Sequence, residues 1–197
     1  MMNVKTSVFC VMSVAILWAG AALAKDTTTY DFSLLDQDGN LVQLSKLKDP
    51  FVVLEWTNPG CPFVKPHYQE DTMTMAKLAQ AYQGKKVTWL VINSTHSFDQ
   101  AQNKAWHTEK KLPYPVLDDH TGEVGKLFKA KTTPHIFVLN QARQVVYQGA
   151  IDDNPRGQNG NNTINYIQQV LDDLTAGKEP RVRQTKSYGC SVKYAPK

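Results

Sequence analysis

Short apolar segments alternate with more polar segments along most of the chain. Three apolar segments, 51–56, 87–92 and 135–139, are rich in valine, isoleucine, leucine and aromatic residues, and they predict buried strands. Residues 145–148 follow the last of these across a polar connection, which predicts a β-hairpin. A second hairpin is expected near the N-terminus, where apolar residues flank the Asp- and Gly-containing turn at 36–40.

The segments between and after these strands are expected to be helical. The predicted helices cover about 61–82, 97–111, 122–129 and 163–175. Ser97 and Gln100 have the spacing of a capping box, and Pro66 is expected to kink the first helix or to force an irregular first turn. This order of elements predicts an α/β fold, with a central mixed sheet covered by helices on both faces.

Length and composition fit one globular domain. The chain has 197 residues, of which 42% are apolar and 20% are charged, so collagen-like and disordered classes are excluded. Its net charge of +4 comes from scattered basic residues, and we expect no nucleic-acid partner.

Residues 1–24 have the features of a signal peptide. Lys5 precedes an apolar segment at 8–17, and Ala22-Leu23-Ala24 resembles a cleavage site. A membrane anchor is the alternative, but the apolar segment is short for a span. We expect an exported, periplasmic or otherwise secreted protein with no stable membrane insertion after cleavage, a domain at 25–176 and a tail at 177–197.

Cleavage would remove Cys10 and leave Cys61 and Cys190 in a compartment that permits disulfides. Cys61 follows a predicted buried strand and begins a predicted helix, where free N–H groups and the helix dipole favour a thiolate. The alternative is an inert buried cysteine. The turn formed by Pro59, Gly60 and Pro62 leaves little room for deep packing, which favours the reactive interpretation.

Four segments resemble the peroxiredoxin-like branch of the AhpC/TSA (thiol-specific antioxidant) redoxin superfamily. These segments are 52–64, 133–139, 147–153 and 185–194. The resemblance implies a thioredoxin-like fold with an N-terminal hairpin extension and a non-helical C-terminal tail. It also implies that Cys61 is the nucleophile and that Thr133 and cis-Pro134 bind substrate.

The chain departs from both relevant subfamilies at the helper positions. Val64 replaces the second cysteine of a thioredoxin Cys-x-x-Cys motif. Asn58 stands where close relatives have a cysteine and typical peroxiredoxins have Thr or Ser, and no peroxide-activating arginine is identified. Pro134 favours the thioredoxin side, so Cys61 corresponds to the nucleophile of both subfamilies.

Other residues are candidates for supporting roles. Cys190 could resolve intermediates at Cys61, form a permanent disulfide with it, or never meet it. Glu55 corresponds to the buried proton-shuttling acid of thioredoxins, or it is a strand-end residue in water. His135 could stabilise the thiolate or bind a metal, or be purely structural. A solvated face is expected for Lys65 and His67, and a turn or capping role for Asp152 and Asp153.

Four functions remain open. The leading hypothesis is a thiol–disulfide oxidoreductase, which acts on protein disulfides or thiols with an external thiol reductant and no cofactor. The second is a peroxidase in which Asn58 and N–H groups of the turn orient the peroxide. The third is a Cu(I) site made by Cys61, Cys190 and His135. The fourth is a binding module without redox activity.

Overall fold

The computed structural model describes residues 28–156 and 162–196. The predicted signal peptide and Cys10 lie outside this part of the chain, so export remains a prediction. No helix within the described residues is long and apolar enough to cross a membrane.

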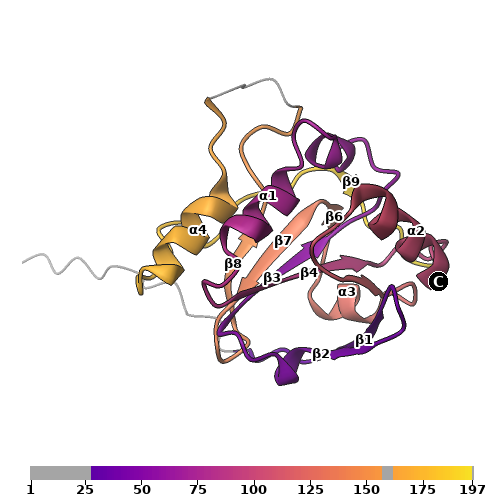
Figure 1. Ribbon diagram of the computed structural model, residues 1–197, viewed down its shortest axis with the longest axis horizontal. Coiled ribbons are helices and arrows are strands. Elements are labelled where there is room, and N and C mark those ends of the chain that lie inside the picture. The colour runs from indigo at the N-terminus through magenta and orange to yellow at the C-terminus, as the bar shows by residue number, and fades with distance from the viewer. Residues whose placement is uncertain (1–27, 157–161, 197) are drawn as a thin grey trace, which may run out of the picture.

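A seven-stranded mixed sheet forms the centre of the molecule (Figure 1). Its order is β2-β1-β5-β4-β3-β7-β8, in which β3 pairs parallel to β4 and antiparallel to β7. The strands are β1 Ser33–Asp36, β2 Leu41–Gln43, β3 Phe51–Trp56, β4 Val87–Asn93, β5 Val116–Asp118, β7 His135–Leu139 and β8 Val145–Gly149. The predicted mixed sheet and both predicted hairpins are confirmed.

The side chains of β3 alternate between two apolar cores, as expected for a strand buried on both faces. Val53 belongs to the core beneath α1 (Thr74–Ala81) and α4 (Tyr166–Thr175). Leu54 and Trp56 belong to the opposite core, which also receives Val124 of α3 (Glu123–Leu127). Helices therefore cover both faces of the sheet, as predicted.

The predicted helix over 61–82 is wrong over its first part, where the irregularity expected at Pro66 extends much further, whereas its last part is α1, which ends where predicted. The segment instead forms a turn, the 3₁₀ helix η2 (Lys65–Tyr68), an irregular stretch and then α1. Pro62 and Pro66 lack backbone N–H groups, and Met73 adopts a left-handed conformation with φ of 40° directly before α1. Two prolines and one left-handed residue therefore prevent a continuous helix over this segment.

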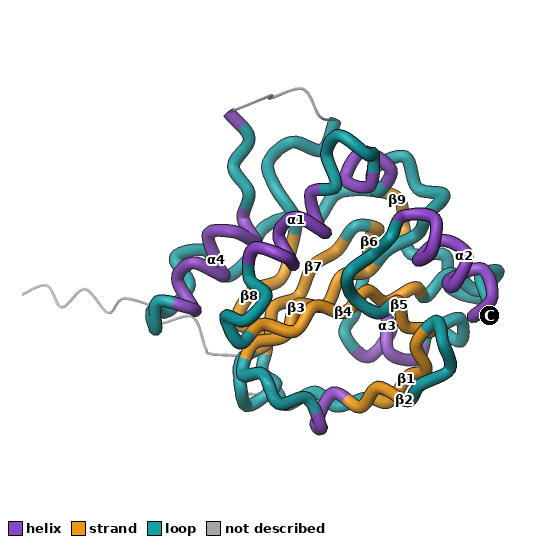
Figure 2. The backbone as a smooth tube through the Cα atoms, viewed as in Figure 1, coloured by secondary structure: helices purple, strands orange, loops and turns teal. Residues whose placement is uncertain are grey.

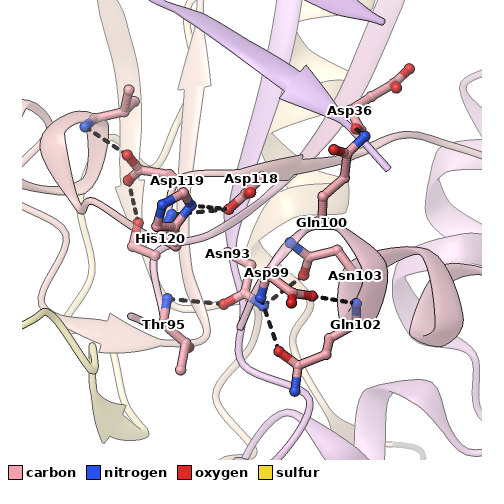
Figure 3. A network of polar contacts seen from close by, with 12 residues as sticks. Asp36, Asn93, Thr95, Asp99, Gln100, Gln102, Asn103, Asp118, Asp119 and His120 are labelled. Carbon is pink, nitrogen blue, oxygen red and sulfur yellow. Dashed lines mark hydrogen bonds and ion pairs between the residues drawn. The ribbon is translucent and has the colours of Figure 1, made fainter. Parts of the chain in front are cut away.

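Smaller differences affect the other elements. The capping box of α2 (Gln100–Lys110) uses Asp99 and Gln102 and not Ser97 and Gln100 (Figure 3). The last helix begins later than predicted, after the cap at Asn165. Strand β5 escaped prediction because it has only three residues and follows a proline-containing segment.

The tail is non-helical, as expected, but it contains an unpredicted strand. This strand, β9 (Cys190–Ser191), pairs antiparallel with β6 (Thr132–Thr133), directly before β7 (Figure 2). On one side of β9, Thr185 bonds to the backbone of Gln148. On the other side, the side chain of Val192 is buried in the core on the α3 side. The tail is thus fixed to the domain both before and after Cys190.

A buried carboxylate links the end of β4 to α3. Asp119 is 1% exposed and accepts hydrogen bonds from the Ser94 hydroxyl and from the backbone N–H groups of Val124 and Gly125. The neighbouring Asn93 bonds to Asn103 and to the backbone of Thr95 (Figure 3). These contacts fix the loops at the same end of the sheet as the end of β3.

Replacing Asp119 by alanine leaves these three donors without their acceptor. We expect Asp119→Ala to lower the free energy of unfolding by about 3 kcal/mol, measured by urea denaturation. A loss below about 1 kcal/mol would show that water replaces the carboxylate at little cost.

Candidate active site

Cys61 lies in a tight turn immediately after β3. The backbone N–H of Cys61 donates to the carbonyl of Asn58 at 2.9 Å, and the Asn58 side-chain oxygen accepts from the N–H of Gly60 at 2.7 Å. Asn58 therefore stabilises the turn through its oxygen, and its predicted donation to a peroxide stays a prediction. Cys61 itself is only 3% exposed.

No regular α-helix begins at Cys61, contrary to the sequence-based expectation. The N–H groups of Val64 and Lys65 both donate to the Cys61 carbonyl and close a single turn. A single turn lacks the aligned peptide dipoles of a long helix. The thiolate must therefore be stabilised by local hydrogen bonds.

The structure brings Cys61 together with Thr133 and Cys190. The Thr133–Pro134 peptide bond is cis, as the resemblance implied. The Cys61 thiol donates to the carbonyl of Thr133 at 3.0 Å, and Thr133 is the register partner of Cys190 in the β6–β9 pair. Both cysteines are free thiols, so the permanent disulfide is not formed in this structure.

The two thiols have opposite pKa shifts. Burial opposes ionisation of Cys61, but hydrogen bonds from the Cys190 thiol and backbone outweigh it, so the pKa of Cys61 lies below its ordinary value. The Thr133 side chain and the Phe63 backbone also favour the thiolate. The hydrogen bond to Cys61 raises the pKa of Cys190. Of the two thiols, Cys61 therefore ionises more readily, and Cys190 keeps its proton to a higher pH.

Glu55 is fully buried on β3. Burial raises the pKa of its carboxyl to about 7, although hydrogen bonds from Tyr68 and Trp89 oppose the shift. The Tyr68 hydroxyl is 2.5 Å from one carboxyl oxygen and the Trp89 indole nitrogen is 3.3 Å from the other. The strand-end residue in water is excluded, and Glu55 can take up or release a proton near neutral pH.

His135 follows the cis-proline but does not make the predicted contact with Cys61. Its Nδ1 atom accepts from the backbone N–H of Lys131 at 3.2 Å, and its ring packs on Phe137. Burial lowers the pKa of His135 to about 4. In the register of β7 with β3, His135 lies opposite Trp56, away from the core that contains Cys61. His135 has a structural role here.

The predicted three-ligand copper site is not assembled. Within residues 28–156 and 162–196, no three His, Cys, Asp or Glu side chains lie close enough together to hold a metal ion. Cys61 and Cys190 meet, but His135 does not join them.

The solvated face predicted for His67 is wrong, whereas the turn role predicted for Asp152 is confirmed, because its carboxylate accepts from the backbone N–H of Asn154 at 2.9 Å. His67 is 7% exposed and not on a solvated face, and its Nε2 atom lies 3.1 Å from the Tyr188 hydroxyl. Tyr188 in turn donates to Asp152 at 2.7 Å. The signal was present, because Asp152 and Tyr188 both fall within family-like segments, but nothing in the sequence linked them to His67.

A groove with a volume of about 330 Å³ adjoins the turn that holds Cys61. Its apolar wall includes Pro59, Val64 and Trp106, and its rim carries Lys65, Glu109 and Lys110. Lys65 is exposed, as predicted. Tyr68, which bonds to Glu55, also lines this groove.

The thiol contact between the two cysteines can be tested by changing Cys190. We expect Cys190→Ala to raise the pKa of Cys61, because alanine cannot donate to the sulfur, whereas Cys190→Ser keeps it lowered through the hydroxyl. Thiolate absorbance against pH, in a Cys10→Ser background, measures the single remaining thiol. Equal pKa values in the two variants would contradict the assigned side-chain contact.

Glu55 predicts a specific pH dependence of stability. The unfolded carboxyl loses its proton near its ordinary pKa of 4.5, whereas the folded one keeps it to about 7. The free energy of unfolding therefore falls between these two pH values, by about 3 kcal/mol for this group. Urea denaturation should show that Glu55→Gln removes this decline, and a decline of unchanged size would assign it to other groups.

The chain resembles known structures over most of its length. A hypothetical protein of Sinorhizobium meliloti 1021 is 28% identical, with a TM-score of 0.79, covering 89% of this chain and 97% of that one. An uncharacterized conserved protein of Geobacillus kaustophilus is 31% identical, with a TM-score of 0.77, covering 90% and 95%. Peroxidoxin BcpB of Mycobacterium tuberculosis is 20% identical with a TM-score of 0.53, covering 78% and 94%, and this likeness shows the fold alone. No curated protein matches the chain.

The fold and the sequence comparisons agree with the resemblance noted above. The sheet order, the cis-proline beside Cys61 and the structural neighbours define a thioredoxin-like fold. The family model described as "AhpC/TSA family" matches residues 26–148, which include β1 to β7 and Cys61. The chain therefore belongs to the AhpC/TSA family of thioredoxin-fold redoxins.

Proposed function

We propose that the protein is a thiol–disulfide oxidoreductase in which Cys61 and Cys190 form the redox pair. The observation that carries this proposal is the contact between the two thiols, with the pKa lowered for Cys61 and raised for Cys190. Cys190 takes the role that a second cysteine has in a Cys-x-x-Cys motif. The membership of the chain in a family of thiol-based redox proteins supports the same chemistry.

The reaction runs in two exchange steps. The Cys61 thiolate attacks one sulfur of a substrate disulfide, which forms a mixed disulfide and releases one substrate thiolate. Cys190 then loses its proton and attacks the Cys61 sulfur, which forms the Cys61–Cys190 disulfide and releases the second substrate thiolate. The substrate gains two electrons and two protons, and an external dithiol or two thiols return the pair to the reduced state.

The tail restricts how a protein substrate reaches the site. The predicted substrate-binding edge at Thr133 and Pro134 is paired with Cys190 of the tail. A polypeptide that uses this edge must displace β9, whereas a smaller disulfide can approach without doing so. The substrate role of Thr133 and Pro134 therefore remains part of the proposal.

A thiol peroxidase is the second candidate. The family assignment and the small space left beside Cys61 favour it, because a peroxide needs no strand pairing. Three arginines are engaged in other contacts: Arg143 bonds to the carbonyls of Leu47 and Asp49, and Arg181 and Arg183 pair with acidic side chains. The fourth arginine, Arg156, is exposed, so the preference for the oxidoreductase rests on the contact between the two thiols.

We also propose export to the cell envelope, with the reduced pair regenerated there by an external thiol. The N-terminal segment described above supports this location. The mildly basic, scattered charge supports an assignment without a nucleic-acid partner.

The decisive experiment measures turnover and the oxidised product together. Wild type should reduce a model disulfide with a thiol reductant, and mass spectrometry should find a Cys61–Cys190 disulfide. We expect Cys61→Ser to abolish turnover, and Cys190→Ser to trap the mixed disulfide. Faster Cys61-dependent consumption of hydrogen peroxide than of the disulfide would rank the peroxidase first, and an unreactive Cys61 would contradict both functions.

A further inference from the structure

A partly buried hydrogen-bonded chain is centred on Tyr188, two residues before Cys190. Tyr188 donates its hydroxyl proton to the carboxylate of Asp152 at 2.7 Å. Because that proton is committed, the Tyr188 oxygen is left to accept from the Nε2–H of His67, 3.1 Å away. Asp152 is 5% exposed and His67 is 7% exposed, so water does not compete freely for these bonds.

This chain joins the two segments that carry the reactive thiols. His67 lies in η2, six residues after Cys61, whereas Tyr188 lies in the tail. Phe63, two residues after Cys61, also contacts the Tyr188 ring, with centroids 6.3 Å apart. Tyr188 is therefore held on one side by the segment after Cys61 and on the other by Asp152.

The residue between Tyr188 and Cys190 packs closely against the backbone of Thr133. Gly189 has φ of 120°, and a Cβ atom there would lie 2.1 Å from the carbonyl oxygen of Thr133. That same oxygen accepts the thiol proton of Cys61. A tail fixed at Tyr188 and pressed against Thr133 at Gly189 has little freedom at Cys190.

We propose that Tyr188, Asp152 and His67 are positioning residues for the redox pair. They hold the tail so that Cys190 stays against Cys61 in the reduced protein. This proposal rests on the oxidoreductase function and deepens it, because it identifies what replaces the short covalent link of a Cys-x-x-Cys motif.

The proposal concerns the second exchange step. With glutathione disulfide, the Cys61 thiolate forms a mixed disulfide and releases one glutathione thiolate. The Cys190 thiolate then displaces the second glutathione, and its proton ends on a glutathione thiolate. Without the anchor, part of the free energy of disulfide formation is spent on ordering the tail, so the effective concentration of Cys190 falls.

The test uses the full chain in a Cys10→Ser background, equilibrated with reduced and oxidised glutathione. Tyr188→Phe keeps the ring that contacts Phe63 and removes both hydrogen bonds. We expect the equilibrium constant for the Cys61–Cys190 disulfide to fall about tenfold, with more Cys61–glutathione mixed disulfide. His67→Leu should have a similar effect, whereas His67→Gln keeps an N–H donor and should retain a constant within about twofold of wild type.

Tyr82→Phe is the matched control. The Tyr82 hydroxyl donates to Asp172 at 2.6 Å, between α1 and α4, so this variant loses the same kind of bond away from the tail. We expect its equilibrium constant to match wild type. A purely structural role of Tyr188, equal in both redox states, would lower the unfolding free energy but leave the equilibrium constant unchanged, and that result would overturn the proposal.

Failure of the two proposals can be told apart. If wild type forms no Cys61–Cys190 disulfide in any glutathione mixture, the proposed redox pair is wrong. If wild type forms it and Tyr188→Phe forms it equally well, only the positioning role is wrong.

Discussion

The pairing of β9 with β6 is the constraint on which the candidate site depends. It places Cys190 opposite Thr133, whose carbonyl oxygen is bound by the Cys61 thiol. Without this pairing, Cys61 would lose the donor that contributes most to its lowered pKa, and Cys190 would no longer lie beside it. The short two-residue strand therefore assembles a site from residues 129 positions apart in the sequence.

A second cysteine that is distant in the sequence must be held near the first by different interactions from those in a Cys-x-x-Cys motif. In a Cys-x-x-Cys motif, only three peptide bonds separate the two cysteines, so the local backbone keeps the second sulfur near the first without help from the rest of the fold. Here Val64 occupies that position and is buried in the core. The proximity of Cys190 must be maintained by noncovalent contacts, each worth about 1 kcal/mol, and under the proposed function the redox equilibrium would therefore depend on how well the tail is ordered. A site of this kind can be adjusted by changing the tail without touching the nucleophile.

The sequence predicted the parts of the molecule that depend on local pattern. The buried strands appear as continuous apolar segments, and Thr133-Pro134 was found by its family-like surroundings. The first part of the helix after Cys61 was wrong because the irregular segment around Pro66 extends to Met73, whose left-handed conformation carries no sequence signal. The same error led to the wrong prediction for His67. Six positions along a regular helix, its side chain would not share the face of the first residue, whereas in η2 it is buried.

Long-range polar contacts were beyond reach for a different reason. Asp152 and Tyr188 are 36 positions apart, and either could have been a surface residue. Asp152 and Tyr188 meet because of the path that the tail takes, and this path depends on two glycines. A Cβ atom at Gly149 would collide with Thr185, and a Cβ atom at Gly189 would collide with the carbonyl of Thr133. Glycines in extended segments mark close backbone approaches but do not name the partner.

Glu55 places an ionisable carboxyl on the same face of the sheet. Side chains alternate along β3, so Glu55 shares the face of Val53, which packs in the core that includes Cys61. A carboxyl with a pKa of about 7 is partly protonated under neutral conditions, so it can accept or supply a proton without large cost. Tyr68 donates a hydrogen bond to this carboxyl and also lines the groove that adjoins the turn holding Cys61. The face of the sheet that packs against the core containing Cys61 thus also carries a fully buried acid, and that burial is what makes its carboxyl titrate near neutral pH.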